Sequence, residues 1–357
     1  MINLATPDIG DAERERVQAV LDSGQLADGP QVRKFETEFA THCEVSHAVA
    51  TANGTTALHA ALKGLGIGSG DCVLTTPFSF IASANAVRLA GAEPIFADID
   101  PTTYTLDPNS VEQAIAAHDG AVDAIIAVHL YGLPADMTRL RKIADEHDIP
   151  LVEDAAQAHG AAVDGEPVGS LGDVACFSFY PTKNMTTGEG GMVVTDDPVV
   201  AARTERFVNH GRGDEGYTDV GHNFRMTSIA AAIGLAQLEC LPEYVATRRE
   251  YAAILTDALS ATDLTTPVEP SDRRHAYNQY TVRCQDRDGL IDQLTAHDIG
   301  HGVYYPTPIN EQEAYSGVTA DTPEAKRAAA EVCSLPVHPA LDQRDIERVA
   351  EVVQTYG

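Results

Sequence analysis

From about residue 45 onward, short apolar runs alternate with longer amphipathic stretches, and this alternation predicts strands and helices in turn. The expected strands cover residues 48–51, 72–76, 94–99, 125–130 and 151–154. The expected helices cover residues 55–65, 81–90, 110–118 and 136–147. Such a βαβα order is typical of a mostly parallel sheet with helices on both faces. We therefore expect a doubly wound α/β fold that binds ligands beyond the carboxyl ends of its strands.

The second half of the chain departs from this simple alternation. Apolar runs at residues 174–179 and 191–195 predict two strands around a polar, glycine-rich turn, and a long helical region is expected over residues 227–259, interrupted near Pro242. Beyond it, one strand (280–284) and two helices (290–297 and 342–355) indicate a smaller α+β unit. We place a large domain at residues 1–240 and a small C-terminal domain at residues 241–357.

Length and composition indicate a globular protein. The chain has 357 residues, 44% of them hydrophobic, which is enough for one large core and a smaller one. We find no apolar run near the ~20 residues that span a bilayer and no basic region followed by an apolar one at the N-terminus, so we expect a cytoplasmic protein without membrane contact. The six cysteines are scattered and form no Cys-x-x-Cys pair, so neither a metal site nor a disulfide framework is expected.

The charge is unusual. The chain has 24 basic and 53 acidic residues, which gives a formal net charge of −29, and the acidic residues are spread along the whole chain. This distribution disfavours an acidic tail and also nucleic-acid binding. Because such a protein repels itself at low ionic strength, we hypothesise that it is halophilic and works in a salt-rich cytosol. The alternative is a merely acidic protein from an ordinary cytosol.

The first candidate for chemistry is Lys183. It lies on the polar turn between the two apolar runs at 174–179 and 191–195, where it has little packing to do. An amine at such a junction can form a Schiff base with a carbonyl cofactor or substrate. Taken alone, an ordinary surface-turn lysine is the commoner case, and the choice depends on partners elsewhere in the chain.

Two loops after strands offer such partners. Asn53-Gly54-Thr55 lies between a strand and a helix, and it could cradle a phosphate at the helix N-terminus or serve only as a helix cap. Phe78 and Phe80 follow the next strand, where an aromatic face could stack on a planar ring or simply pack in the core.

Three further features complete the pattern. Asp154 ends a strand, and its carboxylate could pair with a protonated pyridine nitrogen, cap a helix or bind a metal. Ser178, on the strand before Lys183, could add a hydroxyl to the phosphate cradle. Asn223 and Arg225 lie in a loop before the long helix, where plain surface polarity is the alternative. Together these features supply what pyridoxal phosphate needs: a phosphate site, a stacking face, a carboxylate and a lysine.

At this point the chain resembles a known family, the DegT/DnrJ/StrS-type sugar aminotransferases, which have the type I fold of pyridoxal-phosphate enzymes. The resemblance covers nearly the whole chain. It is carried by Ser23-Gly24, Gly29-Pro30, Phe35-Glu36, Asn53-Gly54-Thr55, Ala57-Leu58, Gly66, Gly70-Asp71, Phe78, Phe80, Glu153-Asp154-Ala155-Ala156, the lysine stretch at 177–191, Asn223, Arg225-Met226 and His338-Pro339.

The resemblance implies roles for four residues around the cofactor ring. Lys183 would form the internal aldimine and then shuttle the proton, and Asp154 would hold the pyridinium nitrogen. Phe80 would stack on the ring, and Gln157 would lie near the ring hydroxyl. Relatives that dehydrate or deoxygenate sugars carry histidine in place of this lysine. The lysine here therefore favours amino transfer.

The resemblance also implies how phosphate and partner are bound. Gly54, Thr55 and Ser178 would bind the cofactor phosphate. Asn223 would reach the phosphate in the neighbouring subunit, which implies a homodimer with shared active sites. The family's usual amino donor is glutamate, and its usual acceptor is a keto sugar on a nucleotide or, less often, a keto-cyclitol.

One departure concerns the acceptor side. Many relatives carry a histidine shortly after the Tyr304-Tyr305-Pro306-Thr307-Pro308 segment, where this chain has Asn310, which cannot act as an acid at neutral pH. A pyridoxal-phosphate aldolase or lyase would use the same Lys183 and Asp154, and a non-catalytic regulator is a third possibility. The leading interpretation is an aminotransferase that acts on a keto sugar.

Overall fold

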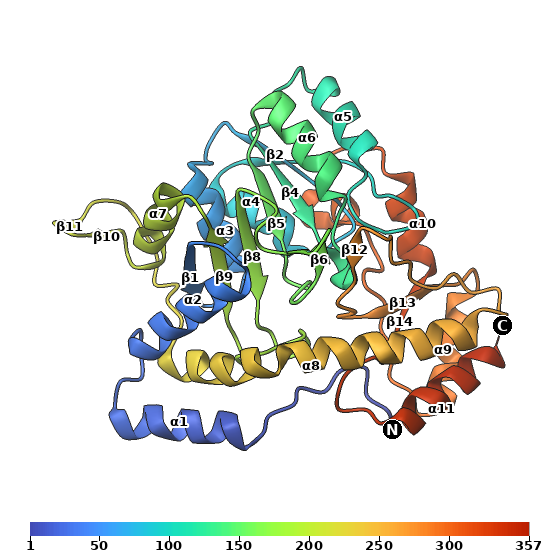
Figure 1. Cartoon of the computed structure of the whole chain (residues 1–357). Coiled ribbons are helices and arrows are strands. Elements are labelled where there is room, and N and C mark those ends of the chain that lie inside the picture. The colour runs from blue at the N-terminus through green and yellow to red at the C-terminus, as the bar shows by residue number, and fades with distance from the viewer. Residues whose placement is uncertain (357) are drawn as a thin grey trace.

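A seven-stranded sheet forms the centre of the molecule, with helices on both of its faces (Figure 1). The structure, a computed structural model, describes residues 1–356. In spatial order the strands are β1 (His47–Thr51), β9 (Gly191–Thr195), β8 (Val174–Ser178), β5 (Leu151–Asp154), β4 (Ala124–Val128), β2 (Cys72–Thr75) and β3 (Glu93–Phe96). Only β9 runs against its neighbours, and the other pairs are parallel. The predicted mostly parallel α/β sheet is confirmed.

The two faces of the sheet bury different side chains because successive residues of a strand point to opposite sides. In β8, Val174 and Cys176 pack on one face, and Ala175 and Phe177 pack on the other. The helices on the first face are α3 (Gly54–Leu65), α4 (Ala82–Ala90) and α7 (Pro198–Val208). Those on the second face are α2 (Pro30–His42), α5 (Pro108–Ala117), α6 (Met137–His147) and α8 (Ser228–Leu259).

A separate hydrophobic cluster lies in the C-terminal part of the chain. It includes Tyr280, Leu290 and Ile346, and Ile2 from the N-terminus joins it through a bridge to Ile299. The elements around it are β13 (Tyr280–Arg283), β14 (Val332–Leu335), α9 (Arg287–Ala296) and α11 (Gln343–Gln354). The division at residue 240 remains a prediction.

The remaining elements are short or peripheral. They are α1 (Asp11–Ser23), α10 (Pro323–Glu331), β6 (Ala162–Val163), β7 (Glu166–Pro167), β10 (Arg212–Gly213), β11 (Gly216–Tyr217), β12 (Arg273–Arg274) and the 3₁₀ turns η1 (Leu130–Gly132), η2 (Ile309–Glu311) and η3 (Glu313–Tyr315). The hairpin of β10 and β11 projects away from the body of the molecule (Figure 1).

Helix α8 corrects one expectation, because it runs without a break from Ser228 to Leu259 and contains Pro242 in its interior. Proline removes one backbone N–H and crowds the preceding turn, which normally interrupts a helix. Here α8 packs against α1, α2 and α11 along its length, so tertiary contacts support the helix on both sides of the proline.

Helix α8 is also the one helix among residues 1–356 that is long and apolar enough to cross a membrane by length and composition. The sequence expectation of no such stretch therefore needs this qualification. Within its most apolar window, 44% of the residues are buried inside the protein. Its contacts with α1, α2 and α11 account for that burial.

The net charge of −29 leads to a prediction about stability. We expect the free energy of unfolding to rise by several kcal/mol between low salt and molar KCl, because screening weakens repulsion among surface carboxylates. Urea unfolding at increasing KCl concentrations measures this change, with glycerol as an uncharged control for solvent exclusion. A free energy of unfolding that does not depend on KCl would contradict the halophile hypothesis.

Candidate active site

The carboxyl ends of the parallel strands bring the predicted site residues to one edge of the sheet. Gly54 follows β1, Phe80 follows β2, and Asp154 and Ser178 are the last residues of β5 and β8. Lys183 lies in the loop that leaves β8. Segments more than a hundred residues apart in the chain therefore meet at a single place.

The loop after β1 forms a cradle at the start of α3. Asn53 caps the helix, since its Oδ1 accepts a hydrogen bond from the Thr56 backbone N–H at 3.0 Å. A Cβ atom on Gly54 would lie 2.7 Å from the Cβ of Ser178, so only glycine lets the two segments approach this closely. The cap does not use the Thr55 hydroxyl. The helix N-terminus, Thr55 and Ser178 thus form a set of donors that fits a phosphate.

This cradle gives a testable prediction. We expect Gly54→Ala to lower the free energy of unfolding by about 1–3 kcal/mol and to weaken phosphate binding, because the added methyl group collides with Ser178. Thermal unfolding and cofactor titration measure the two effects. In the double variant Gly54→Ala/Ser178→Gly the collision is removed, so stability should recover while phosphate affinity stays low. A Gly54→Ala protein with unchanged stability would show that the segments around Gly54 and Ser178 can move apart to accommodate the methyl group.

Asp154 is a buried carboxylate with few partners. Its Oδ2 accepts a hydrogen bond from Ser83 Oγ at 2.7 Å, and its Oδ1 accepts a long one from the Ala156 backbone N–H at 3.3 Å. Burial raises the pKa of Asp154, and the Ser83 hydroxyl, the Ala156 amide and the charge of Lys183 oppose that rise. Oδ1 therefore keeps capacity for a stronger donor, such as a protonated ring nitrogen.

Lys183 is partly buried, and burial lowers its pKa from the ordinary 10.5 to about 8, although Asp154 pulls the pKa upward. A lowered pKa leaves more of the amine neutral near physiological pH. The neutral amine is the form that attacks a carbonyl carbon.

We predict the pH dependence of that attack. In the cofactor-free protein, the rate at which an aldehyde binds Lys183 should rise with pH and level off above about 8. At pH 7 about one amine in ten would be neutral, against fewer than one in a thousand for an unperturbed lysine. Stopped-flow absorbance with pyridoxal phosphate measures the rate. A rate that keeps rising to pH 10 would contradict the lowered pKa.

Gln157 and two aromatic residues lie around the same edge. The buried Gln157 accepts a hydrogen bond from the Tyr131 backbone N–H at 2.7 Å and donates one to the Tyr305 hydroxyl at 3.2 Å. Phe80 is 56% exposed, and its ring centroid lies 6.0 Å from that of Tyr305. An exposed aromatic face at this edge of the sheet is available to a planar ligand.

Asn223 is placed differently from the other predicted residues. It is exposed, its backbone pairs with Asn209, and the next residue, Phe224, accepts a hydrogen bond from the Ala52 backbone N–H at 2.7 Å. The loop therefore lies beside the end of β1. Asn223 takes no part in the close approach of Gly54 to Ser178 or in the electrostatic interaction between Asp154 and Lys183.

Sequence reasoning gave no role to the residues that support the site, although Glu153 belongs to a motif that carries the family resemblance. The fully buried Glu153 accepts hydrogen bonds from the backbone N–H groups of Gly169, Leu171 and Gly172. It also accepts one from His129 Nε2 at 2.9 Å, since His129 Nδ1 already accepts the Ala135 N–H. Glu153 therefore fixes the end of β5 immediately before Asp154. The one signal in the sequence was an acidic residue, Glu153, directly before Asp154 at the end of an apolar strand.

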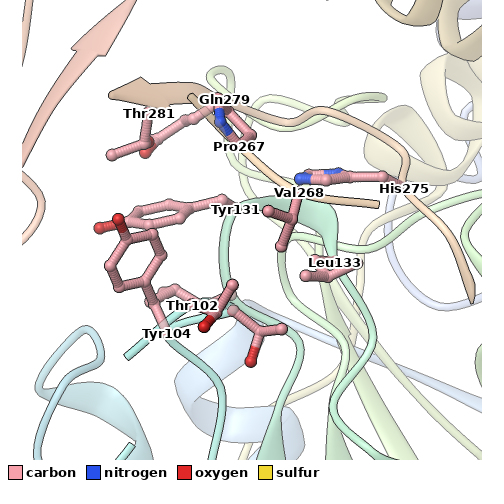
Figure 2. Close-up of a pocket in the computed structure, with 11 residues that line it drawn as sticks. Thr102, Tyr104, Tyr131, Leu133, Pro267, Val268, His275, Gln279 and Thr281 are labelled. Carbon is pink, nitrogen blue, oxygen red and sulfur yellow. The ribbon is translucent and has the colours of Figure 1, made fainter. Parts of the chain in front are cut away.

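A small cavity is lined in part by Tyr131, whose backbone N–H donates to Gln157 (Figure 2). Tyr131 and Tyr104 meet there edge to face, with their ring centroids 6.0 Å apart, and His275, Gln279 and Thr281 face them. Its volume of about 10 Å³ is that of a single water, so it cannot hold a cofactor or a sugar. Within residues 1–356 no group of three or more His, Cys, Asp or Glu side chains is arranged to hold a metal ion.

Comparison with known proteins shows the family to which the chain belongs. Residues 7–354 match the model of the DegT/DnrJ/EryC1/StrS aminotransferase family, and the chain belongs to this family of pyridoxal-phosphate enzymes. The predicted enzyme class and cofactor are thereby confirmed. The cradle, the buried carboxylate, the lysine and the exposed aromatic face all fit pyridoxal phosphate.

Three similar proteins indicate the range of the family. UDP-N-acetyl-3-dehydro-alpha-D-glucosamine 3-aminotransferase of Acidithiobacillus ferrooxidans is 39% identical, over 94% of this chain and 91% of its own. GDP-perosamine synthase of Caulobacter vibrioides is also 39% identical, over 98% and 96%. The crystal structure of a DegT DnrJ EryC1 StrS aminotransferase from Brucella abortus has a TM-score of 0.94 at 34% identity, over 97% and 95% of the two chains.

Proposed function

We propose that the protein transfers the amino group of glutamate to the ketone of a nucleotide-linked sugar in the cytoplasm. The observation that carries this proposal is the meeting of Lys183, Asp154 and the Gly54–Ser178 cradle at one edge of the sheet. The names of the two relatives described above support a nucleotide sugar as the acceptor. One name contains UDP and the other GDP at the same identity, so overall likeness favours neither nucleotide.

The residues divide the work as follows. Pyridoxal phosphate, when bound, supplies an aldehyde that combines with amines and a ring that withdraws electrons from the neighbouring carbon. Gly54, Thr55 and Ser178 would hold its phosphate. Asp154 would keep a proton on the ring nitrogen by pairing with it. Lys183 would bind the aldehyde through Nζ, and its free amine would accept and return a proton at the same atom.

The first test is an absorbance titration with L-glutamate and no acceptor, in high KCl. The band of the lysine-bound cofactor should disappear, and one equivalent of 2-oxoglutarate should be released. If the band persists while borohydride still links the cofactor to Lys183, the donor or the reaction is different. An aldolase or lyase then becomes the better proposal.

The acceptor is tested with the amine-loaded protein. Keto sugars linked to UDP, dTDP and GDP, and a keto-cyclitol without a nucleotide, should be offered separately, and return of the original band identifies the acceptor. On the acceptor side, Asn310 donates a hydrogen bond to Thr322 Oγ1 at 3.4 Å, and its buried Oδ1 has no partner within residues 1–356. A reaction with the cyclitol alone would overturn the nucleotide-sugar proposal.

We also propose a homodimer in which Asn223 of each subunit completes the phosphate site of the other. The exposure of Asn223 supports this arrangement, and so does the neighbouring hairpin, on which Tyr217 is 74% exposed. Val220, just beyond the hairpin, is 91% exposed. Large apolar side chains on a projecting segment are commonly covered by a partner.

Mixing inactive subunits tests this sharing. Lys183→Ala and Asn223→Ala subunits, mixed under exchange, should recover about one quarter of the native activity, since half of the dimers would contain one intact site of two. Lys183→Ala mixed with Asp154→Asn is the matched control, because both residues belong to the same subunit's site and no intact site can form. If the first mixture stays inactive, Asn223 does not act across the interface.

A further inference from the structure

Two serines lie in a row behind Asp154. Ser83, in the first turn of α4, donates a hydrogen bond to Asp154 Oδ2 at 2.7 Å. Ser79, in the loop after β2, has its Oγ 2.9 Å from Ser83 Oγ. All three side chains are more than nine-tenths buried, at 5%, 1% and 6% exposure for Ser79, Ser83 and Asp154. Bulk water therefore does not supply these hydrogen bonds.

The direction of the hydrogen bonds follows from the charge of Asp154. An ionised carboxylate can only accept, so Ser83 must use its single hydroxyl proton on Oδ2. The Ser83 oxygen is then free to accept the proton of Ser79. Both hydroxyl dipoles therefore point toward the carboxylate. If Asp154 were protonated on Oδ2, Ser83 would have to turn its proton toward Ser79 instead.

The two carboxylate oxygens consequently have different surroundings. Oδ2 is held by a short hydrogen bond from a side chain, whereas within residues 1–356 Oδ1 has only the 3.3 Å contact with the Ala156 amide. A short hydrogen bond to a charged acceptor stabilises the charge and also restricts rotation about the Cβ–Cγ bond. Ser83 thus leaves Oδ1 as the oxygen that faces a new donor.

We propose that Ser83, polarised by Ser79, is a positioning residue that keeps Asp154 ionised and presents its Oδ1 to the ring nitrogen of the cofactor. This inference rests on the proposed role of Asp154 in the function above. It gives the hydroxyl groups of Ser79 and Ser83, which lie between the end of β2 and the first turn of α4, a role in keeping the ring nitrogen protonated. A serine that merely satisfied a buried group would serve stability alone.

The test compares two cofactors in the full-length protein. Pyridoxal phosphate has a ring nitrogen, and 1-deazapyridoxal phosphate has a carbon there, so the ratio of their dissociation constants isolates the contact with Asp154. We expect Ser83→Ala to weaken the binding of pyridoxal phosphate about 10-fold or more, as the loss of a hydrogen bond to a charged group implies. The dissociation constant of the deaza analogue should not change. Ser83→Thr keeps the hydroxyl and should restore the native ratio.

A second readout follows the ring nitrogen directly. With ¹⁵N-labelled cofactor, the nitrogen chemical shift in the native protein should report a protonated ring across pH 6–9. In Ser83→Ala the carboxylate is harder to ionise, so the ring nitrogen should lose its proton within that range. Ser79→Ala should shift the titration in the same direction by a smaller amount. A merely structural serine would move neither the ratio nor the shift.

A matched control separates folding from positioning. Ser334 is also fully buried, and its hydroxyl pairs with Thr281 Oγ1 at 2.8 Å in the C-terminal β13–β14 pair. Ser334→Ala should lower the unfolding temperature as Ser83→Ala does, but it should leave the ratio of cofactor affinities at the native value. An equal change of the ratio in both variants would overturn the inference.

The outcomes also distinguish this inference from the function on which it rests. If Asp154→Asn abolishes the preference for pyridoxal phosphate over the deaza analogue while Ser83→Ala leaves it intact, Asp154 has its proposed role and Ser83 does not. If even Asp154→Asn leaves the preference unchanged, the proposed role of Asp154 fails first. The inference is supported when both variants reduce the preference and Ser83→Thr does not.

Discussion

Lys183→Ala should lose amino transfer by at least about 10³-fold, because no other group would bind the cofactor aldehyde or carry the proton. The loss should appear in the glutamate half-reaction itself, measured by single-turnover absorbance. The cradle is untouched, so the variant should still bind the cofactor without a covalent bond. Added methylamine should restore part of the rate, because a small free amine can take over from the missing side chain.

Two variants serve as controls for this prediction. Lys183→Arg keeps a positive charge near Asp154 but cannot bond the aldehyde, so it should be as inactive as Lys183→Ala. Lys34→Ala removes a lysine from the exposed face of α2 and should be fully active. If borohydride fixed the cofactor on another lysine in Lys183→Ala, and the activity survived, the assignment of Lys183 would be wrong.

Asp154→Asn should slow the reaction by about 10²- to 10³-fold, which is the usual effect of losing one well-placed electrostatic contact at a reacting group. The amide has nearly the same shape but no charge, so the ring nitrogen would lose the partner that keeps it protonated. In the cofactor-free protein, burial raises the pKa of Asp154 above its ordinary value, so binding of pyridoxal phosphate should weaken on acidification at a higher pH than an exposed aspartate would give.

The control for this variant is another buried aspartate. Asp98 accepts hydrogen bonds from the backbone N–H groups of Glu324 and Ala325 at the start of α10, at 2.8 and 2.9 Å. Asp98→Asn should therefore destabilise the fold and leave the protonation of the ring nitrogen unchanged. A native rate in Asp154→Asn would mean that the ring needs no carboxylate, and the aminotransferase proposal would lose its main support.

Much of the sheet could be predicted because strands and helices differ in the period of their apolar residues. The differences lie at the element ends. The strand expected over residues 94–99 ends at Phe96, since Asp98 turns away to cap α10, which begins 225 residues later in the chain. The interruption expected near Pro242 is absent for a related reason, because the contacts that keep α8 intact come from α1, α2 and α11.

The site shows the same division between local and distant causes. Gly54, Asp154 and Lys183 carry recognisable local patterns, and the structure brings them together. Their roles remain predictions. Ser83 and Tyr305 carry no such pattern, and each reaches the site through a hydrogen bond to a residue far away in sequence, 71 and 148 positions distant. Single-sequence reasoning has no access to such pairs.

The reversed direction of β9 has a topological consequence. A connection between two parallel strands starts at the carboxyl edge of the sheet and must reach the amino edge. It therefore crosses a face of the sheet, usually as a helix. Because β9 is antiparallel to β8, the chain from Ser178 to Gly191 can start and finish at the same edge, and these two residues pair directly. Both ends of the loop that carries Lys183 therefore lie at the edge where the ligand-binding loops are, and this connection needs no helix across the sheet.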